Sequence, residues 1–165
     1  ISQHADSMGA PNACKEKGIP NVTYNVSTEN DCKDSYVIGS RINWAPYYKY
    51  IVEATIKNET IPYDWTGTLQ SDSVQLLEIG KAAAAGTAEK LAEVKAALEN
   101  GTLNVFDTNN FTVNGKHITS FFADVDDAGD YVPETEVVAN GILKESAFRS
   151  APYFTLDIDG ITLLK

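Results

Sequence analysis

Basic residues are scarce in this sequence. Its 165 residues include 13 lysines and arginines against 23 aspartates and glutamates, which gives a formal net charge of −10 at pH 7. The basic residues do not gather in any one stretch. Because a protein that binds the phosphate backbone needs a concentrated basic surface, we expect no nucleic-acid partner.

Long apolar runs are also missing. No stretch approaches the ~20 apolar residues that span a bilayer. The sequence begins at Ile1, with neither an initiator methionine nor the charged and apolar regions of a signal peptide. Residues 1–26 instead indicate the end of a strand, a loop, a short helix and another strand, so we expect a piece of a longer chain.

Cysteine and histidine each occur only twice. Cys14 and Cys32 lack the C-x-x-C spacing and the neighbouring histidines of a zinc site, so no structural zinc is expected. The two cysteines fit either a disulfide in an exported protein or a pair of buried free thiols.

Motifs of nucleophilic and phosphate-binding enzymes are absent, including G-x-S-x-G, the P-loop and G-x-G-x-x-G. DVDDAGD, residues 124–130, resembles the start of a calcium loop, but Ala128 and Thr135 occupy two positions where ligands belong. His117 falls in a hairpin-like segment, where an exposed polar side chain is the ordinary outcome. We therefore assign no catalytic residue, no metal and no cofactor.

Helix and strand signals alternate through residue 106 and predict the α/β class. Pro11 and Gly18 bracket a first helix, Pro46 begins a second over about residues 45–57, and Thr87 and Gly101 fit the N-cap and C′ of a third. Strands are expected at residues 21–26, 36–42, 65–70, 73–80 and 103–107.

Two glycine-containing turns mark residues 107–165. Asn114–Gly115 and Asp159–Gly160 lie between β-prone flanks, which is the strongest short hairpin signal. Residues 121–150, between these turns, are acidic and predict no element. We expect residues 1–106 to form the α/β part of the chain and residues 107–165 a β-hairpin-rich extension packed on it.

Polar residues follow three expected strands where each strand ends: QHADS (3–7), YNVST (24–28) and SRINW (40–44). The carboxyl ends of parallel strands meet at one edge of a sheet, where ligands bind in open α/β folds. Amides, a carboxylate, a histidine and an indole suit a sugar or nucleoside. The alternative is that these residues only cap helices and form turns.

Aromatic residues crowd residues 44–50, which read WAPYYKY. Tyr47, Tyr48 and Tyr50 belong to the expected helix, and aromatic stripes at helical spacing usually pack into a core. Trp44 precedes the helix, on the turn after a strand. We therefore expect the tyrosines in the core and Trp44 beside a ligand pocket.

ISQHADSMGAPNACKEKGI, NWAPYY and KAALENGTLNVF, with NGK downstream, resemble the C-terminal half of the basic membrane protein family. These proteins are lipid-anchored substrate-binding components of ABC importers, many of them for purine nucleosides. The resemblance covers about residues 1–106. It implies a two-lobed type I periplasmic-binding fold, a nucleoside-like ligand between the lobes, an ABC permease as partner, an N-terminal lobe not included here, and an extracytoplasmic location through a lipid anchor.

Ligand contacts are implied by the same resemblance at the three strand ends. The family's ribose-contacting loop falls near Asp6 and Ser7, beside His4. Its ribose-binding aspartate falls on Asn25, which keeps hydrogen-bonding capacity and loses the charge. Its basic residue falls around residues 42–43, where Arg41 is the nearest cation, and its N-W-x-P-Y-Y motif matches Asn43 and Trp44.

Two other functions fit these patterns. One is a ligand-sensing domain of the same fold that reports to a regulator. The other is a hydrolase of sugars or nucleosides, which would need a spaced pair of carboxylates where the strand ends offer only Asp6.

If part of the fold is missing, apolar surface should be exposed, and we also expect self-association of the fragment.

Overall fold

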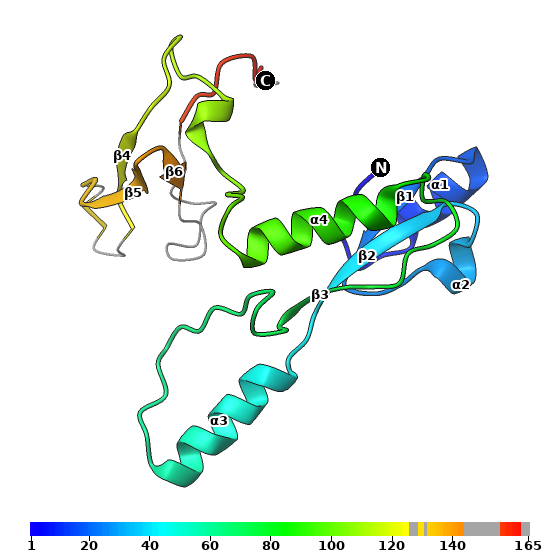
Figure 1. Cartoon of the computed structure of the whole chain (residues 1–165), viewed down its shortest axis with the longest axis horizontal. Helices are drawn as coiled ribbons and strands as arrows, with labels where there is room; N and C mark the ends of the chain where they lie inside the picture. The colour runs from blue at the N-terminus through cyan, green and yellow to red at the C-terminus, as the bar shows by residue number, and fades with distance from the viewer. Residues whose placement is uncertain (126–128, 131, 144–155, 163–165) are drawn as a thin grey trace. The chain divides into compact units, whose positions relative to one another are not determined.

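The computed structural model describes residues 1–125, 129–130, 132–143 and 156–162. The chain divides into two compact units, Ile1–Thr102 and Leu103–Lys165. The first unit is mixed α/β and the second is built mainly from short strands (Figure 1). The α/β class expected from the sequence is therefore confirmed for the first unit.

A three-stranded sheet in the order β1-β2-β3 forms the centre of the first unit. β1 (Asn21–Tyr24) and β2 (Tyr36–Ile42) are parallel, and Ser2 forms a parallel bridge to Val22 on the outer side of β1. β3 (Val74–Leu76) runs antiparallel to β2. The expected run of parallel strands thus holds for the first three segments, and the fourth reverses direction.

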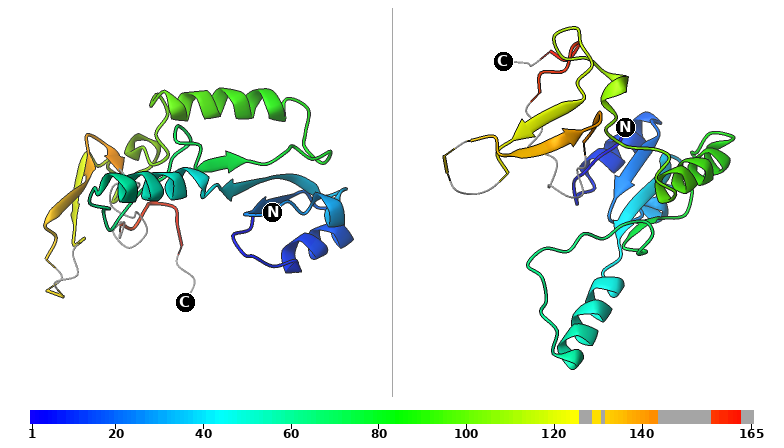
Figure 2. Two further views of the ribbon diagram at one scale, coloured as in Figure 1. Left: turned by 90° about the horizontal axis from the view of Figure 1, so that it is seen from below. Right: turned by 60° about the vertical axis from the view of Figure 1, so that its left-hand side comes forward.

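Helices lie on both faces of this sheet. α4 (Thr87–Glu99) lies over one face, and α1 (Gly9–Lys17) lies on the other (Figure 2). α1 ends at Gly18, whose φ of 64° is in the left-handed region that glycine enters without strain. The sequence predicted both ends of this helix correctly.

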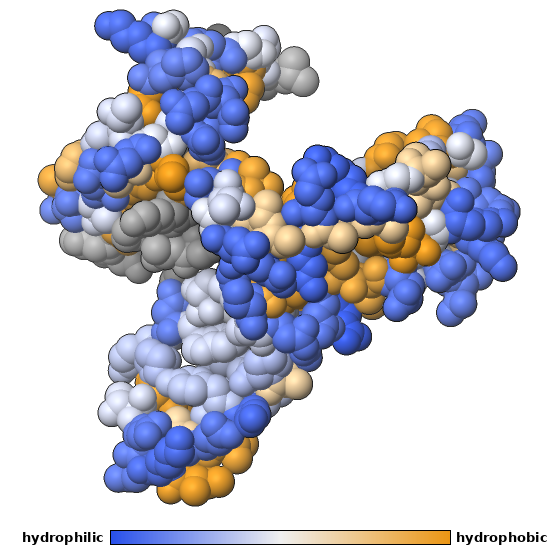
Figure 3. All heavy atoms as spheres, viewed as in Figure 1, coloured by the Kyte–Doolittle hydropathy of each residue, from blue (hydrophilic) through white to orange (hydrophobic). Residues whose placement is uncertain are grey.

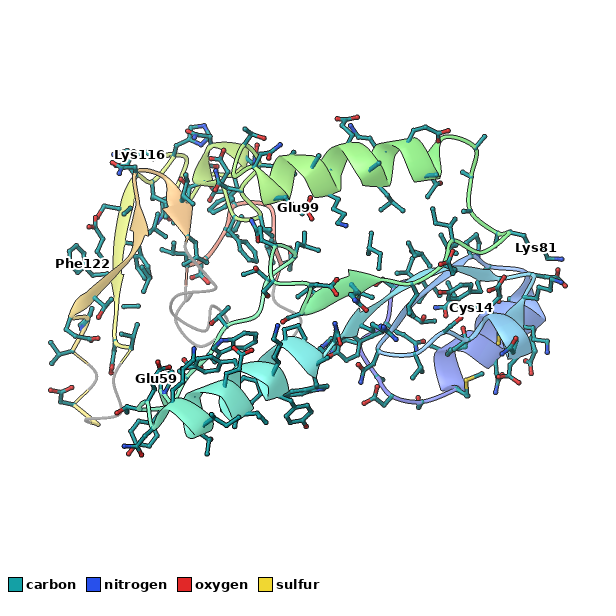
Figure 4. The ribbon with its side chains drawn as sticks, turned by 60° about the horizontal axis from the view of Figure 1, so that its bottom comes forward. Cys14, Glu59, Lys81, Glu99, Lys116 and Phe122 are labelled. Carbon is teal, nitrogen blue, oxygen red and sulfur yellow. The ribbon has the colours of Figure 1, made fainter. Side chains whose placement is uncertain are left out.

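The two cysteines lie on α1 and on the short helix α2 (Glu29–Cys32). Both side chains are buried and carry free thiols, and Figure 4 labels Cys14. Of the two alternatives for these cysteines, the structure therefore shows the pair of buried thiols.

α3 (Ala45–Lys57) begins with Pro46 in its first turn and ends at Asn58, whose φ is 55°. Its bounds agree with the prediction. The start of α4 does not: its N-cap is Gly86 (φ 83°) and not Thr87, which is the first helical residue. The left-handed backbone at position 86 favours glycine, and this places the helix start one residue earlier than the threonine suggested. Gly101 follows α4 in the left-handed region, as predicted.

Residues 65–70 were expected to form a strand, and this expectation is wrong. The amide of Thr68 donates to Ser71 Oγ (2.9 Å), and the amide of Ser73 donates to the carbonyl of Thr68 (3.1 Å). Short hydroxyl side chains compete with strand pairing by bonding to nearby backbone groups, and here they close a turn before β3 begins.

The second unit contains the antiparallel strands β4 (Ser120–Ala123), β5 (Thr135–Ala139) and β6 (Ile142–Leu143), in that order. Apart from Ser120, they lie within residues 121–150, for which the sequence predicted no element. Asn140 (φ 53°) and Gly141 (φ 76°) join β5 to β6, which is the conformation that two-residue hairpins require. Val137, Val138 and Leu143 are the buried centre of this sheet.

Residues 103–107 were expected to form a strand but make only one bridge, between Asp107 and Ile142. A 3-10 helix, η1 (Thr108–Asn110), follows directly.

The Asn114–Gly115 turn forms with both φ angles positive, and its flanks pair only at Val113 and Lys116. Residues 126–128 of the calcium-like stretch and most flanks of the Asp159–Gly160 turn lie outside the described residues.

The side chain of Asp159 holds the Asn114–Gly115 turn. Its carboxylate accepts hydrogen bonds from Thr112 Oγ1 (2.6 Å) and from the amides of Gly115 (2.7 Å) and Asn114 (3.1 Å). The bond from Thr112 is the main reason that the pKa of Asp159 lies below its ordinary value of 3.8, and the bond from Gly115 adds to it. The ionised carboxylate therefore links two segments 45 residues apart along the chain.

Acidification is expected to release this turn. A carboxyl whose folded-state pKa is lowered stabilises the fold above its unfolded-state pKa, and this contribution is lost as the pH falls through the folded-state value. The amide of Gly115 should then lose protection from hydrogen exchange, after correction for the intrinsic rate at each pH. Asp159→Asn should show the same loss at pH 7. Asp157→Asn, at an exposed position on the same segment, is the control, and equal protection of Gly115 in both variants would contradict the role of Asp159.

Candidate functional site

A cavity of about 190 Å³ opens where β1 ends. Its walls come from the loop after the N-terminal bridge, from the end of β1 and from the segment that leads to α2. The lining residues are Gln3, Ala5, Asp6, Ser7, Met8, Thr23, Tyr24, Val26 and Thr28.

The first wall is held in place by backbone pairing and by one amide side chain. The backbone of Gln3 donates to the carbonyl of Val22 (3.2 Å), which fixes the N-terminal segment alongside β1. Gln3 Nε2 then donates to the carbonyls of Ala5 (3.2 Å) and Ser7 (3.3 Å). The loop is thereby folded around the Gln3 side chain, and Asp6 and Ser7 reach the cavity.

The second wall follows β1. Asn25 has a φ of 70°, which turns the chain sharply after Tyr24. Its backbone amide donates to the carbonyl of Ser40 (2.6 Å), and Thr23 Oγ1 donates to the carbonyl of Val26 (3.0 Å). These bonds hold Val26 and Thr28 over the end of the strand.

Two of the lining residues have a buried polar atom without a hydrogen-bond partner in the described structure: Gln3 Oε1 and Thr28 Oγ1. Thr28 is 3% exposed. A buried polar group without a partner costs about 1–3 kcal/mol, so each such group calls for an explanation. A ligand that donates hydrogen bonds from hydroxyl or amine groups would satisfy both.

A stacked pair of rings lies next to the cavity. The rings of His4 and Tyr24 have their centroids 4.3 Å apart with an interplanar angle of 27°. Tyr24 lines the cavity, whereas His4 stacks on Tyr24 and is not among the lining residues. Asp6 is the one charged residue among the described lining residues, so the cavity favours neutral or cationic groups over anions.

The predicted site residues separate into two groups. Asp6 and Ser7 line the cavity, and His4 and Asn25 adjoin it through Tyr24 and the following turn. The remaining three, Arg41, Asn43 and Trp44, do not line it.

The length of β2 explains this separation. Tyr24, the last residue of β1, pairs with Ser40, so residues 41–44 continue beyond the end of β1. There Arg41 Nε donates to Gln75 Oε1 (2.7 Å), and Asn43 Nδ2 donates to the carbonyl of Asp72 (3.0 Å). These side chains therefore bind β3 and the turn before it.

Trp44 belongs to an aromatic cluster on α3. Its ring lies 6.4 Å from Tyr47 and 6.2 Å from Tyr48, measured between centroids. Trp65, which the sequence did not single out, lies 5.2 Å from Tyr47 and packs on Tyr50 as well. Tyr47 and Tyr50 are half-buried by these contacts, but Tyr48 is 61% exposed, so its assignment to the core is wrong.

The sequence prediction missed Gln3, Thr23 and Thr28 as individual site residues. Gln3 and Thr28 lie within the two stretches that were singled out, and Thr23 precedes the second. Polar side chains at a strand end were the available signal. Which of these side chains line the cavity depends on the direction that the chain takes after the turn at Asn25. The sequence alone does not give that direction.

Comparison with known protein families and with curated proteins finds no match to this chain. Within the described ranges, no group of three or more His, Cys, Asp or Glu side chains could hold a metal ion. None of the helices in the same ranges is long and apolar enough to cross a membrane.

Proposed function

We propose that this chain binds the sugar part of a nucleoside-like ligand and is part of the solute-binding component of an ABC importer. One observation carries the binding proposal: Gln3 Oε1 and Thr28 Oγ1 are buried, lack partners in the described structure and belong to residues that line the same cavity. The hydroxyl groups of a sugar are donors that match both atoms.

The importer role rests on the sequence resemblance, and the location of the cavity supports it. The QHADS stretch, which carries part of that resemblance, supplies Gln3, Asp6 and Ser7 to the cavity wall. Parallel pairing of the N-terminal segment, β1 and β2 is compatible with one lobe of a periplasmic-binding fold. A permease partner and an extracytoplasmic location are part of this proposal.

The size of the cavity limits what it can hold. A volume of about 190 Å³ is below the ~300–1,000 Å³ of typical small-molecule sites. A sugar ring fits such a volume better than a whole nucleoside does. The base would then need a wall outside this cavity, so we expect the chain by itself to bind weakly.

The charge of the cavity favours a nucleoside over a nucleotide. The carboxylate of Asp6 would repel a phosphate group, and none of the described lining residues is a lysine or arginine that could compensate. Glycoside hydrolysis takes two carboxylates, and Asp6 is the single carboxylate among those lining residues. We therefore propose binding without turnover.

The proposal predicts which amides respond to a ligand. In a ¹⁵N–¹H titration, inosine, adenosine and ribose should shift the amides of Ser7, Thr23 and Thr28 in a saturable way. Ribose 5-phosphate should require at least about tenfold higher concentrations, because its phosphate adds repulsion. Equal shifts with both sugars, or shifts confined to residues outside the cavity, would contradict the proposal.

A further inference from the structure

One face of α3 carries apolar side chains that the rest of the described structure leaves exposed. Trp44, Tyr48, Val52 and Ile56 are 55%, 61%, 56% and 79% exposed. Residues four positions apart lie on one side of a helix, so these four form a continuous stripe along α3. We call it the α3 stripe, and Figure 3 shows apolar side chains at the surface of this helix.

The α3 stripe is distinct from the face that packs within the first unit. That face carries Ala54, which is buried, and Tyr47 and Tyr50, whose rings lie against Trp65. The charged residues Lys49 and Glu53 border the stripe on its other side. The helix thus has a packed face, a charged edge and an exposed apolar face.

We propose that the α3 stripe is the contact surface between two copies of this chain, with the two α3 helices antiparallel. A two-fold interface requires a surface that complements itself, so that each residue meets its counterpart in both directions. Trp44 and Ile56 are each six positions from residue 50, and Tyr48 and Val52 are each two positions from it. An antiparallel pair therefore places the rings of one copy against the branched aliphatic side chains of the other.

The charges beside the stripe are complementary in the same arrangement. Lys49 and Glu53 are exposed neighbours on one copy, with Nζ and Oε1 3.8 Å apart. In the antiparallel pair centred at residue 50, Lys49 of one copy lies only two residues, about 3 Å along the helix axis, from the level of Glu53 of the second copy, and the reverse. Two pairs of opposite charges then form across the axis, whereas a parallel two-fold arrangement would place the charged edges of the two copies on opposite sides of the interface.

The area is sufficient for a modest dimer. Aromatic side chains bury up to about 150–250 Å² each, so the exposed parts of the four stripe residues amount to about 500 Å² per copy. Two copies would bury about 1,000 Å², near the lower limit for a specific interface. We therefore expect an association that depends on concentration.

Sedimentation velocity of the full chain over a wide concentration range tests this. The wild-type chain should shift from monomer to dimer as the concentration rises. Val52→Glu should weaken association at least about tenfold, because it buries a charge at the centre of the contact. Ala88→Glu adds the same charge at an exposed position on α4 and is the matched control. Circular dichroism of both variants checks that the helices remain folded.

Charge reversal tests the antiparallel arrangement. Lys49→Glu and Glu53→Lys should each weaken the dimer, because each places like charges opposite one another. The double variant K49E/E53K should restore it. A chain that stays monomeric at every concentration, or dimerises equally with Val52→Glu, would overturn the proposal. Failure of the double variant to restore a dimer that the single variants weaken would overturn the antiparallel arrangement.

Discussion

Replacing Gly80 with alanine is expected to lower the free energy of unfolding by about 3 kcal/mol, since added volume in a packed core forces neighbouring groups apart. Gly80 follows β3 and donates its backbone amide to the carbonyl of Val37 (2.8 Å). A Cβ atom at this position would overlap the carbonyl oxygen of Tyr36 and lie 2.5 Å from Tyr36 Cδ1. Tyr36 is fully buried, so neither group can move away freely.

Urea unfolding followed by circular dichroism measures this effect. Gly9→Ala is the control, because a Cβ there meets only Ser7 Oγ, at an ordinary contact distance of 3.7 Å. The Gly9 variant should unfold at nearly the wild-type urea concentration. If Gly80→Ala unfolded there too, the close approach of residue 80 to Tyr36 would not exist in solution.

The sequence predicted those elements whose ends carry strong local signals. Gly18 ends α1 because it enters the left-handed region without strain, and Pro46 fits the first turn of α3. The 36–42 strand was predicted with its observed bounds, since its apolar residues are bordered by polar ones. In each of these cases a local preference and the fold agree.

One failure arises where a distant group competes with local pairing. Asn114–Gly115 and Asn140–Gly141 have the same hairpin signal, but only the second joins paired strands. At Asn114–Gly115, the carboxylate of Asp159 accepts hydrogen bonds from both backbone amides. A partner 45 residues away cannot be inferred from the local sequence.

The candidate site was predicted in part for a similar reason. Polar residues at strand ends identified Asp6 and Ser7, which line the cavity. The same rule suggested Asn43 and Trp44, but β2 continues beyond the end of β1 and carries them away from it. Strand register and relative length arise from tertiary packing, so the spacing of residues in the sequence did not specify them.

Replacing Thr28 with valine is expected to raise the free energy of unfolding by about 1 kcal/mol while it weakens ligand binding about tenfold. Valine has nearly the shape of threonine and lacks the hydroxyl, and Thr28 Oγ1 is buried without a partner in the described structure. Removing an unpaired buried polar atom stabilises the free protein. A bound ligand that pairs with this hydroxyl would lose one hydrogen bond.

Thr23→Val is the matched control, because Thr23 is also buried and lines the same cavity, but its hydroxyl donates to the carbonyl of Val26 (3.0 Å). This substitution breaks an existing bond, so it should lower the free energy of unfolding by about 1 kcal/mol. The two variants should therefore change stability in opposite directions in urea unfolding. Stability that rises in Thr28→Val with ribose binding unchanged would show that the hydroxyl is unpaired but does not contact the sugar. Stability that falls equally in both variants would mean that Thr28 Oγ1 has a hydrogen-bond partner in the free protein. The main observation in favour of a ligand in this cavity would then be wrong.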